Sequence, residues 1–124
     1  MSAKDMLKRD INAIYQAADA GATLDTLLTQ IIDAFRNYEE AFSGITYSYR
    51  LSTTDTGISK AFALDDGKFS LVGDDEEVDA AISGTEKNLL AVIRRELAPL
   101  SALLFKKIKL KGSKNALIRL GEFL

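Results

Sequence analysis

The sequence predicts a two-layer α+β domain with the element order αα–ββββ–αα–β–α. Three observations lead to this prediction: the apolar period is helical up to residue 43, it changes to two from Ile45, and the last quarter alternates between helix and strand around the only proline. Hairpin strands followed by segregated helices are typical of this fold class. At 124 residues with 47% apolar side chains, the chain is expected to form one globular domain over residues 1–124.

Two amphipathic helices are predicted before the first strand. Apolar residues at helical spacing predict one helix over residues 4–19 and a second from about residue 24 to residue 42. Thr23 or Asp25 is the expected N-cap of the second helix, and Ser43-Gly44 is expected to end it. The first apolar stripe contains Leu7, Ile11, Ile14 and Ala18, and the second contains Leu24, Leu27, Leu28, Ile31, Ile32, Phe35, Tyr38 and Phe42.

Four strands are predicted next. Residues 45–51 alternate apolar and polar side chains, which predicts a half-buried strand. Residues 58–64 and 68–72 predict a hairpin around Asp65-Asp66-Gly67, because glycine readily adopts the positive φ of tight turns. Residues 73–77 form an acidic loop, interpreted as solvated rather than metal-binding, and residues 78–82 predict a short fourth strand.

The C-terminal part predicts three helices and one strand. Ser83-Gly84-Thr85-Glu86 fits a capping box, with Thr85 as an alternative cap, for a helix that extends toward Leu97. Pro99 suits the first turn of a short helix that ends near Phe105. Residues 107–111 predict a fifth strand with three lysines on one face, and Ser113 can cap a last helix.

The net charge of −2 hides two oppositely charged parts. Residues 1–86 carry seven basic and sixteen acidic side chains, whereas residues 87–124 carry nine basic and two acidic ones. Either the two parts neutralise each other, or the basic part forms a rim that attracts carboxylate or phosphate headgroups or an anionic membrane surface. A nucleic-acid partner is not expected, because the pI is about 5.1 and no aromatic stacking motif is present.

The composition disfavours catalysis. The chain has no cysteine and no histidine, so it lacks a thiolate and the commonest general base and metal ligand. Asp65-Asp66 and Asp74-Asp75 fall in turns that are expected to be exposed, and Ser83-Gly84-Thr85 lacks the pattern of a nucleophile elbow. We therefore expect a protein that is not an enzyme and uses no metal or cofactor. The polar N-terminus and the lack of a long apolar segment lead us to expect a cytoplasmic location.

The order of motifs from residue 45 onward resembles the sterol carrier protein-2 family. The run Lys107-Ile108-Lys109-Leu110-Lys111-Gly112 is similar to the family's Lys-Leu-Lys-Ile-Lys-Gly run. It follows Leu97-Ala98-Pro99 and Phe105, and the Asp65-Asp66-Gly67 hairpin and the strand over residues 78–82 precede it in the family order. The resemblance divides the chain into N-terminal helices, residues 1–43, and a family-like core, residues 44–124. Arg95 and Lys106 stand where members usually have glycine.

The resemblance implies a five-stranded, largely antiparallel twisted sheet covered by helices, with an apolar tunnel between them. It also implies a lipid carrier for a fatty acid, fatty acyl-CoA, sterol or similar ligand, without covalent catalysis. Arg95, Lys106 and Lys107 are expected to form a basic rim for the headgroup. The tunnel is expected to be lined by Phe62, Leu89, Ile93, Leu100, Leu103, Leu104, Phe105, Ile108, Leu117, Leu120, Phe123 and Leu124.

The same apolar residues have a second interpretation. Leu103, Leu104 and Phe105 are consecutive and cannot all point the same way on a helix, so the C-terminal helices carry apolar side chains on more than one face. Such an excess fits either a tunnel or an oligomer interface. The alternative to a lipid carrier is therefore an accessory interaction or dimerisation module, in which Arg95 and Lys106 close the tunnel.

Overall fold

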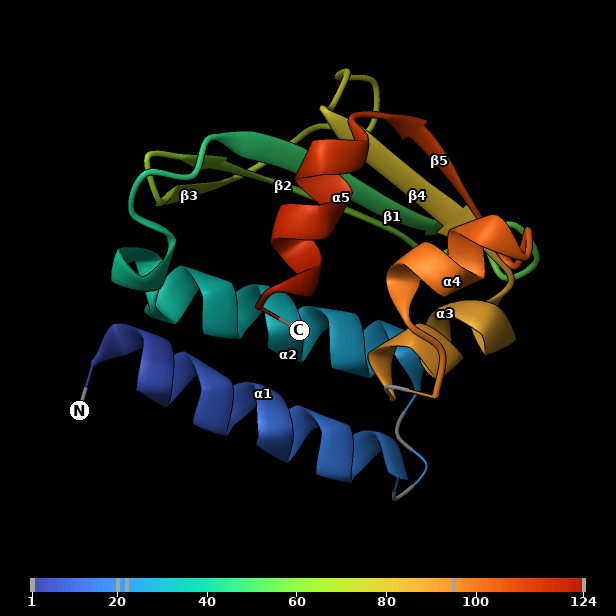
Figure 1. Cartoon of the computed structure of the whole chain (residues 1–124), viewed down its shortest axis with the longest axis horizontal. Helices are drawn as coiled ribbons and strands as arrows, with labels where there is room; N and C mark the ends of the chain where they lie inside the picture. Colours follow the sequence, from blue (N-terminus) through green and yellow to red (C-terminus); the bar gives the residue numbers. More distant parts are fainter. Residues whose placement is uncertain (1, 20, 22, 95, 124) are drawn as a thin grey trace.

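The computed structural model of the chain describes residues 2–19, 21, 23–94 and 96–123. Its elements follow the predicted order, with one short 3-10 helix, η1, added before the first strand (Figure 1). The elements are α1 (Ala3–Asp19), α2 (Leu24–Asn37), η1 (Glu39–Phe42), β1 (Tyr47–Thr53), β2 (Ser59–Asp65), β3 (Lys68–Leu71), β4 (Ala80–Gly84), α3 (Glu86–Ile93), α4 (Pro99–Leu104), β5 (Ile108–Gly112) and α5 (Lys114–Gly121).

The five strands form one sheet in the order β3-β2-β1-β4-β5. Neighbouring strands are antiparallel except β1 and β4, which are parallel, so the largely antiparallel sheet is confirmed. The turn between β2 and β3 has positive φ at Asp66 (50°) and Gly67 (84°), as a type I′ hairpin requires. Gly112 ends β5 with a φ of 113°, and a Cβ there would overlap the backbone oxygen of Asp79.

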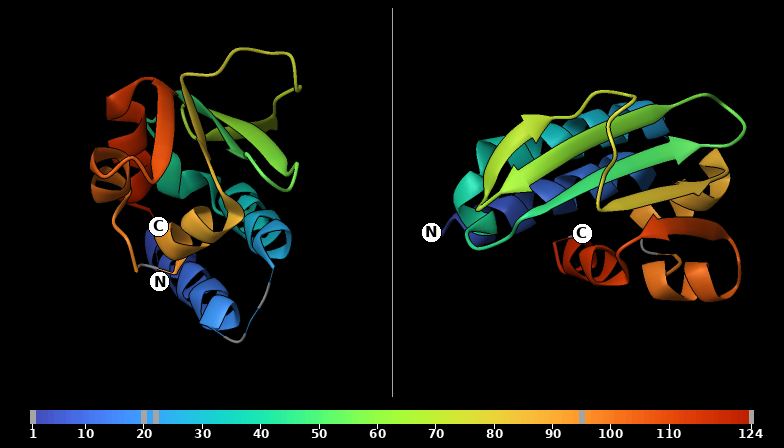
Figure 2. Two further views of the ribbon diagram at one scale, coloured as in Figure 1. Left: turned by 90° about the vertical axis from the view of Figure 1, so that its right-hand side faces the viewer. Right: turned by 90° about the horizontal axis from the view of Figure 1, so that it is seen from above.

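The helices lie on one face of the sheet and form two tiers there. Figure 1 shows α2 below the sheet and α1 below α2, while α5 lies under the middle strands and α3 and α4 lie at one end. Seen from above, the sheet faces the viewer, α1 and α2 lie behind it, and α4 and α5 are seen beside its β4–β5 edge (Figure 2, right). The prediction of two layers therefore missed a tier. The wide apolar stripe of α2 explains it, because this helix is buried both by the sheet and by α1.

Some helix boundaries differ from the predicted ones. Helix α2 stops at Asn37 instead of residue 42, since Tyr38 leaves the helical region and its hydroxyl donates a hydrogen bond to Asp10 (2.9 Å). Helix α3 is capped by Thr85, whose hydroxyl accepts from the Asn88 amide, while Ser83 belongs to β4. Helix α3 also ends at Ile93 rather than near Leu97.

The expected caps of the other helices are present. Thr23, the first of the two expected caps, accepts a hydrogen bond from the Thr26 amide, and Ser113 accepts one from the Ala116 amide. Pro99 occupies the first turn of α4, where it costs no hydrogen bond. In the part of the chain that the structure describes, no helix has the length and apolar composition needed to cross a bilayer.

Candidate functional site

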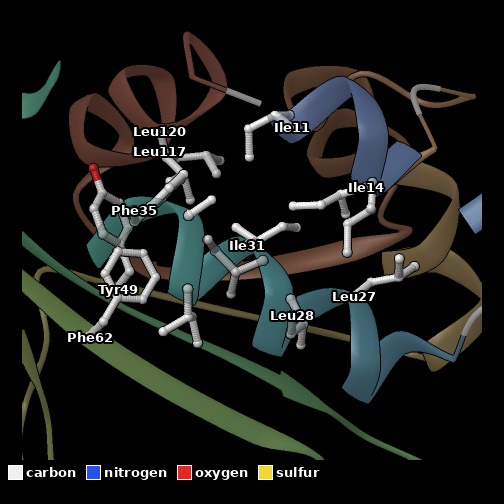
Figure 3. Close-up of a cluster of buried hydrophobic side chains, with 14 of the residues drawn as sticks. Ile11, Ile14, Leu27, Leu28, Ile31, Phe35, Tyr49, Phe62, Leu117 and Leu120 are labelled. Carbon is white, nitrogen blue, oxygen red and sulfur yellow. The ribbon is translucent and has the colours of Figure 1, made fainter. Parts of the chain in front are cut away.

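The space between the sheet and the helices is filled by one apolar cluster. Side chains from both tiers of helices and from the central strands meet there (Figure 3). Aromatic rings form its centre: Phe35 lies 5.5 Å from Phe62 and 4.7 Å from Phe42, and Tyr49 lies 5.4 Å from Phe62, measured between ring centroids. The residues labelled in Figure 3 are Ile11, Ile14, Leu27, Leu28, Ile31, Phe35, Tyr49, Phe62, Leu117 and Leu120.

Tyr49 links the sheet to α5 through a buried polar contact. Its side chain is 1% exposed, and its hydroxyl donates a hydrogen bond of 2.7 Å to the backbone oxygen of Ala116. Figure 3 shows this hydroxyl directed toward α5. Burial in the apolar cluster raises the pKa of the Tyr49 phenol well above its ordinary value, because the phenolate would lose its hydration. The phenol is therefore held neutral as a donor, and it fixes α5 against β1.

The residues predicted to line a tunnel fall into groups by exposure. Phe62, Leu89, Ile93, Ile108, Leu117 and Leu120 are buried and belong to the same apolar cluster, to which Leu103 and Phe123 add partly buried side chains. Leu100, Leu104 and Phe105 lie at the surface, 46%, 76% and 66% exposed. Leu124 and Arg95 lie outside the described residues. Lys106 and Lys107 are exposed, as a headgroup rim requires.

The short helix α4 explains why two of the apolar residues, Leu100 and Leu104, point outward. Its buried residue is Ala102, which is 0% exposed. Leu100 and Leu104 lie two residues before and after it, about 200° around a helix, and therefore on the opposite side. As placed here, these side chains do not line the space between the sheet and the helices.

A pocket of about 450 Å³ opens between the start of α1 and the end of the chain. Its inner wall is apolar, because Leu7 and Ile11 are buried and Phe123 is half-buried beside the Phe42 ring, 4.6 Å away between centroids. Its outer lining is charged and consists of Lys4, Asp5, Lys8 and Glu122. Lys4 and Lys8 are one helical turn apart and share a face of α1. The pocket therefore offers an amphiphile an apolar wall together with two cations and two carboxylates.

The contribution of α1 to this pocket was missed by the sequence reasoning. Only Phe123 among its lining residues was expected to contact a ligand. The family resemblance began at residue 45, so α1 was assigned no role beyond packing. The available signal was the spacing of Lys4 and Lys8 beside the apolar stripe of Leu7 and Ile11.

The tunnel itself stays a prediction. The pockets that we describe open at the surface, on α1 and α2 or near the β2–β3 turn, and side chains fill the space between the sheet and the helices. Within residues 2–19, 21, 23–94 and 96–123, no group of three or more acidic side chains is placed to hold a metal ion. The chemistry that the pocket at α1 supports is contact with an apolar group beside charged side chains of both signs.

Comparisons with known proteins extend the resemblance along the chain. The family model described as the SCP-2 sterol transfer family matches residues 24–124, so it includes α2 and leaves out α1. No curated protein matches the chain. Several solved structures share the fold of the chain.

Three structures illustrate this similarity. Sterol carrier protein 2-like 2 from Aedes aegypti, in palmitated form, has a TM-score of 0.54 and 21% identity, covering 82% of this chain and 93% of its own. Sterol carrier protein-2 like-3 from the same organism has a TM-score of 0.54 and 18% identity, covering 82% and 96%. The inverting sec-alkylsulfatase Pisa1 from Pseudomonas sp. has a TM-score of 0.65 and 16% identity over 79% of this chain, which spans only 16% of that enzyme.

Proposed function

The chain belongs to the SCP-2 sterol transfer family, a family of lipid-binding and lipid-transfer proteins, and we propose that it is a non-catalytic carrier of a fatty acid, fatty acyl-CoA or similar apolar ligand. The observation that carries this proposal is the pocket between α1 and Phe123, where Lys4 and Lys8, among charged side chains of both signs, lie beside an apolar wall. A carrier needs both features, because its ligand is apolar along the chain and charged at the head.

The binding energy of such a ligand comes from its hydrocarbon chain. Each buried methylene group contributes about 0.8 kcal/mol, so a chain of about 16 carbons gains roughly 12 kcal/mol in the apolar interior. Association costs of about 4 kcal/mol, the low end of the range, are subtracted, which leaves roughly 8 kcal/mol and therefore affinity in the micromolar range. The lysines then add preference for an anionic headgroup more than affinity.

We propose that the acyl chain enters past Phe123 into the apolar cluster. Phe123 stands between the pocket and the Phe42 ring, and Leu117 and Leu120 of α5 lie beyond it. Because these side chains fill the interior in the structure described here, binding requires α5 to move away from its apolar neighbours. This motion would open the space that the tunnel prediction assigns to Leu117, Leu120 and Phe62.

Two sets of cations are candidates for the headgroup. Lys4 and Lys8 are at the rim of the pocket, whereas Lys106 and Lys107 are the described members of the predicted basic rim. A straight-chain ligand is the preferred class, and the palmitated state of the mosquito protein with the same fold supports this preference.

The first test is native mass spectrometry of gently purified protein, followed by solvent extraction of any bound molecule. A mass shift that resolves into fatty acids or another lipid is expected. The protein freed of lipid is then titrated with palmitate in vesicle-free buffer. Protein that remains bare and ignores added acyl chains would contradict the carrier function and favour an interaction or dimerisation module.

Variants locate the binding site. Phe123→Ala removes the ring at the inner end of the pocket and is expected to change palmitate affinity by about fivefold or more, given the worth of a large apolar side chain. Phe105→Ala is the matched control, because its ring is 66% exposed on α4. The pair Lys4→Ala and Lys8→Ala is expected to weaken binding of palmitate but not of hexadecanol, which lacks the negative charge. Equal losses for both ligands would exclude these lysines as the headgroup site.

A further inference from the structure

The turn between α4 and β5 carries an exposed surface that is both apolar and basic. We call it the α4 tip, and it consists of Leu100, Leu104, Phe105, Lys106 and Lys107. Leu104 and Phe105 are 76% and 66% exposed, and both lysines are exposed beside them. Helix α4 and strand β5 lie side by side at one end of the molecule, away from β3 at the other edge of the sheet (Figures 1 and 2).

The α4 tip is a well-formed turn. The Lys106 amide donates to the Leu103 oxygen (3.1 Å) and the Lys107 amide donates to the Ala102 oxygen (2.8 Å), which together make a Schellman helix end. The side chain of Asn88 on α3 also donates to the Lys107 oxygen (2.9 Å). The exposed apolar side chains are therefore presented by a fixed backbone.

Lys106 occupies the position in this turn that favours glycine. Its φ is 58°, in the left-handed region where side chains with a Cβ lose stability. Glycine there would relieve the strain and remove the charge. The strained lysine is exposed, so its charge is presented at the surface beside Leu104 and Phe105.

The chain segment that contains the α4 tip carries charge of a single sign. Residues 97–121 contain six lysines or arginines and no acidic residue. Lys109 and Lys111 continue the row of exposed lysines along the edge strand β5. Among the described residues, Lys106, Lys107, Lys109 and Lys111 form no ion pair, in contrast to Arg119, which pairs with Glu122 (2.9 Å). These four lysines are therefore available at the surface without a direct acidic partner among the described residues.

We propose that the α4 tip docks on the surface of a bilayer that contains anionic phospholipid. Leu104 and Phe105 enter the boundary between headgroups and acyl chains, and the lysines contact the lipid phosphates. A flat anionic surface fits a convex turn with apolar side chains at its end and cations at its base. A second copy of the chain fits less well, because a two-fold contact would place lysines against lysines.

The α4 tip is connected to the proposed ligand site. The N-terminal residue of α4, Pro99, packs on Gly121 of α5, 4.0 Å from a Cβ built there, and Phe123 of the pocket follows two residues later. Docking would therefore bring α5 close to the bilayer that donates or accepts the ligand. The purpose of docking rests on the proposed carrier function, whereas the evidence for docking is the α4 tip itself.

Vesicle co-sedimentation of the full chain tests the proposal. Binding to phosphatidylcholine vesicles that contain phosphatidylglycerol is expected, with little binding to phosphatidylcholine alone and weaker binding as salt rises toward about 0.15 M. The double variant Leu104→Ser with Phe105→Ser is expected to lower the partition coefficient about tenfold or more. Lys106→Gly is expected to lower it about fivefold while keeping the fold at least as thermally stable as wild type.

Matched controls lie on the opposite edge of the sheet. Leu71 is 66% exposed, as is Phe105, and Lys68 is an exposed lysine on the same strand, β3. Leu71→Ser and Lys68→Ala are expected to leave vesicle binding unchanged. Equal losses in these controls, binding that ignores lipid charge, or a dimer in sedimentation that Leu104→Ser disrupts without any vesicle binding would overturn the proposal.

The palmitate titration in vesicle-free buffer separates this proposal from the carrier function. Leu104→Ser with Phe105→Ser is expected to bind palmitate as wild type does, because these side chains point away from the interior. Vesicle binding without any palmitate binding would support docking and contradict the carrier function. Palmitate binding without vesicle binding would support the carrier function and contradict docking.

Discussion

Removal of a single oxygen atom, in Tyr49→Phe, tests how α5 is held to the sheet. The variant keeps the ring that packs 5.4 Å from Phe62, and it loses the hydrogen bond to the Ala116 oxygen. Such a bond contributes about 1 kcal/mol net, so the free energy of unfolding at pH 7 is expected to fall by roughly that amount. The loss would loosen the helix that we propose moves on ligand binding.

The pH dependence of this difference has a defined sign. The pKa of the Tyr49 phenol is raised by burial in the folded state, whereas in the unfolded chain it is about 10. The stability that the neutral phenol provides is therefore complete below about pH 10 and is lost as pH rises toward the folded-state pKa. At pH 11, release of the Tyr49 proton stabilises the unfolded state by about 1.4 kcal/mol. This gain is as large as, or slightly larger than, the contribution of about 1 kcal/mol that the hydrogen bond makes to the folded state.

The assay compares guanidinium unfolding of wild type and Tyr49→Phe by circular dichroism at pH 7, 9 and 11. The difference in unfolding free energy is expected to be the same at pH 7 and 9 and close to zero, or slightly reversed, at pH 11. Contributions of lysines and of the other tyrosines cancel, because both proteins share them. A difference that stays constant up to pH 11 would refute the raised phenol pKa, and no difference at pH 7 would refute the role of the hydrogen bond.

Three further variants test particular elements of the fold by the same unfolding assay. Gly112→Ala is expected to cost about 2 kcal/mol or more, because its φ of 113° and the overlap with the Asp79 oxygen both oppose a Cβ; wild-type stability would contradict this geometry. Ile11→Ala is expected to cost about 3 kcal/mol, since this side chain is 1% exposed; a change below about 0.5 kcal/mol would mean that α1 is not part of the cooperative core. Thr85→Ala is expected to cost about 1 kcal/mol, because the hydrogen bond from the Asn88 amide is lost. Thr85→Ser should keep most of this stability. No change in stability for Thr85→Ala would contradict Thr85 as the N-cap and favour Ser83.

Local patterns in the sequence determined most of the elements. The spacing of Leu7, Ile11 and Ile14 predicted α1, the alternation around Tyr49 predicted β1, and Asp65-Asp66-Gly67 predicted the hairpin. These features depend on neighbours within a few residues, where helix and strand periods and turn chemistry act directly. The family resemblance then supplied the sheet, because its motifs occur in order along the chain.

Only the tertiary structure decided which apolar residues face inward. Leu103, Leu104 and Phe105 are all large apolar residues, yet Leu103 is partly buried whereas Leu104, opposite the buried Ala102, and Phe105, at the end of α4, are exposed to solvent. The meeting of α1 with Phe123 could not be read from the sequence either, because it joins the two ends of the chain.

The sequence by itself therefore determined the fold class, the family and the net positive charge of the C-terminal part. The tertiary structure decided that α1 forms a second tier, that Lys106 has a positive φ, and that the exposed apolar side chains share a turn with unpaired lysines. The physical reason is the range of the interactions. Periods and caps act along the chain, whereas the orientation of a face depends on what packs against it from distant parts of the sequence.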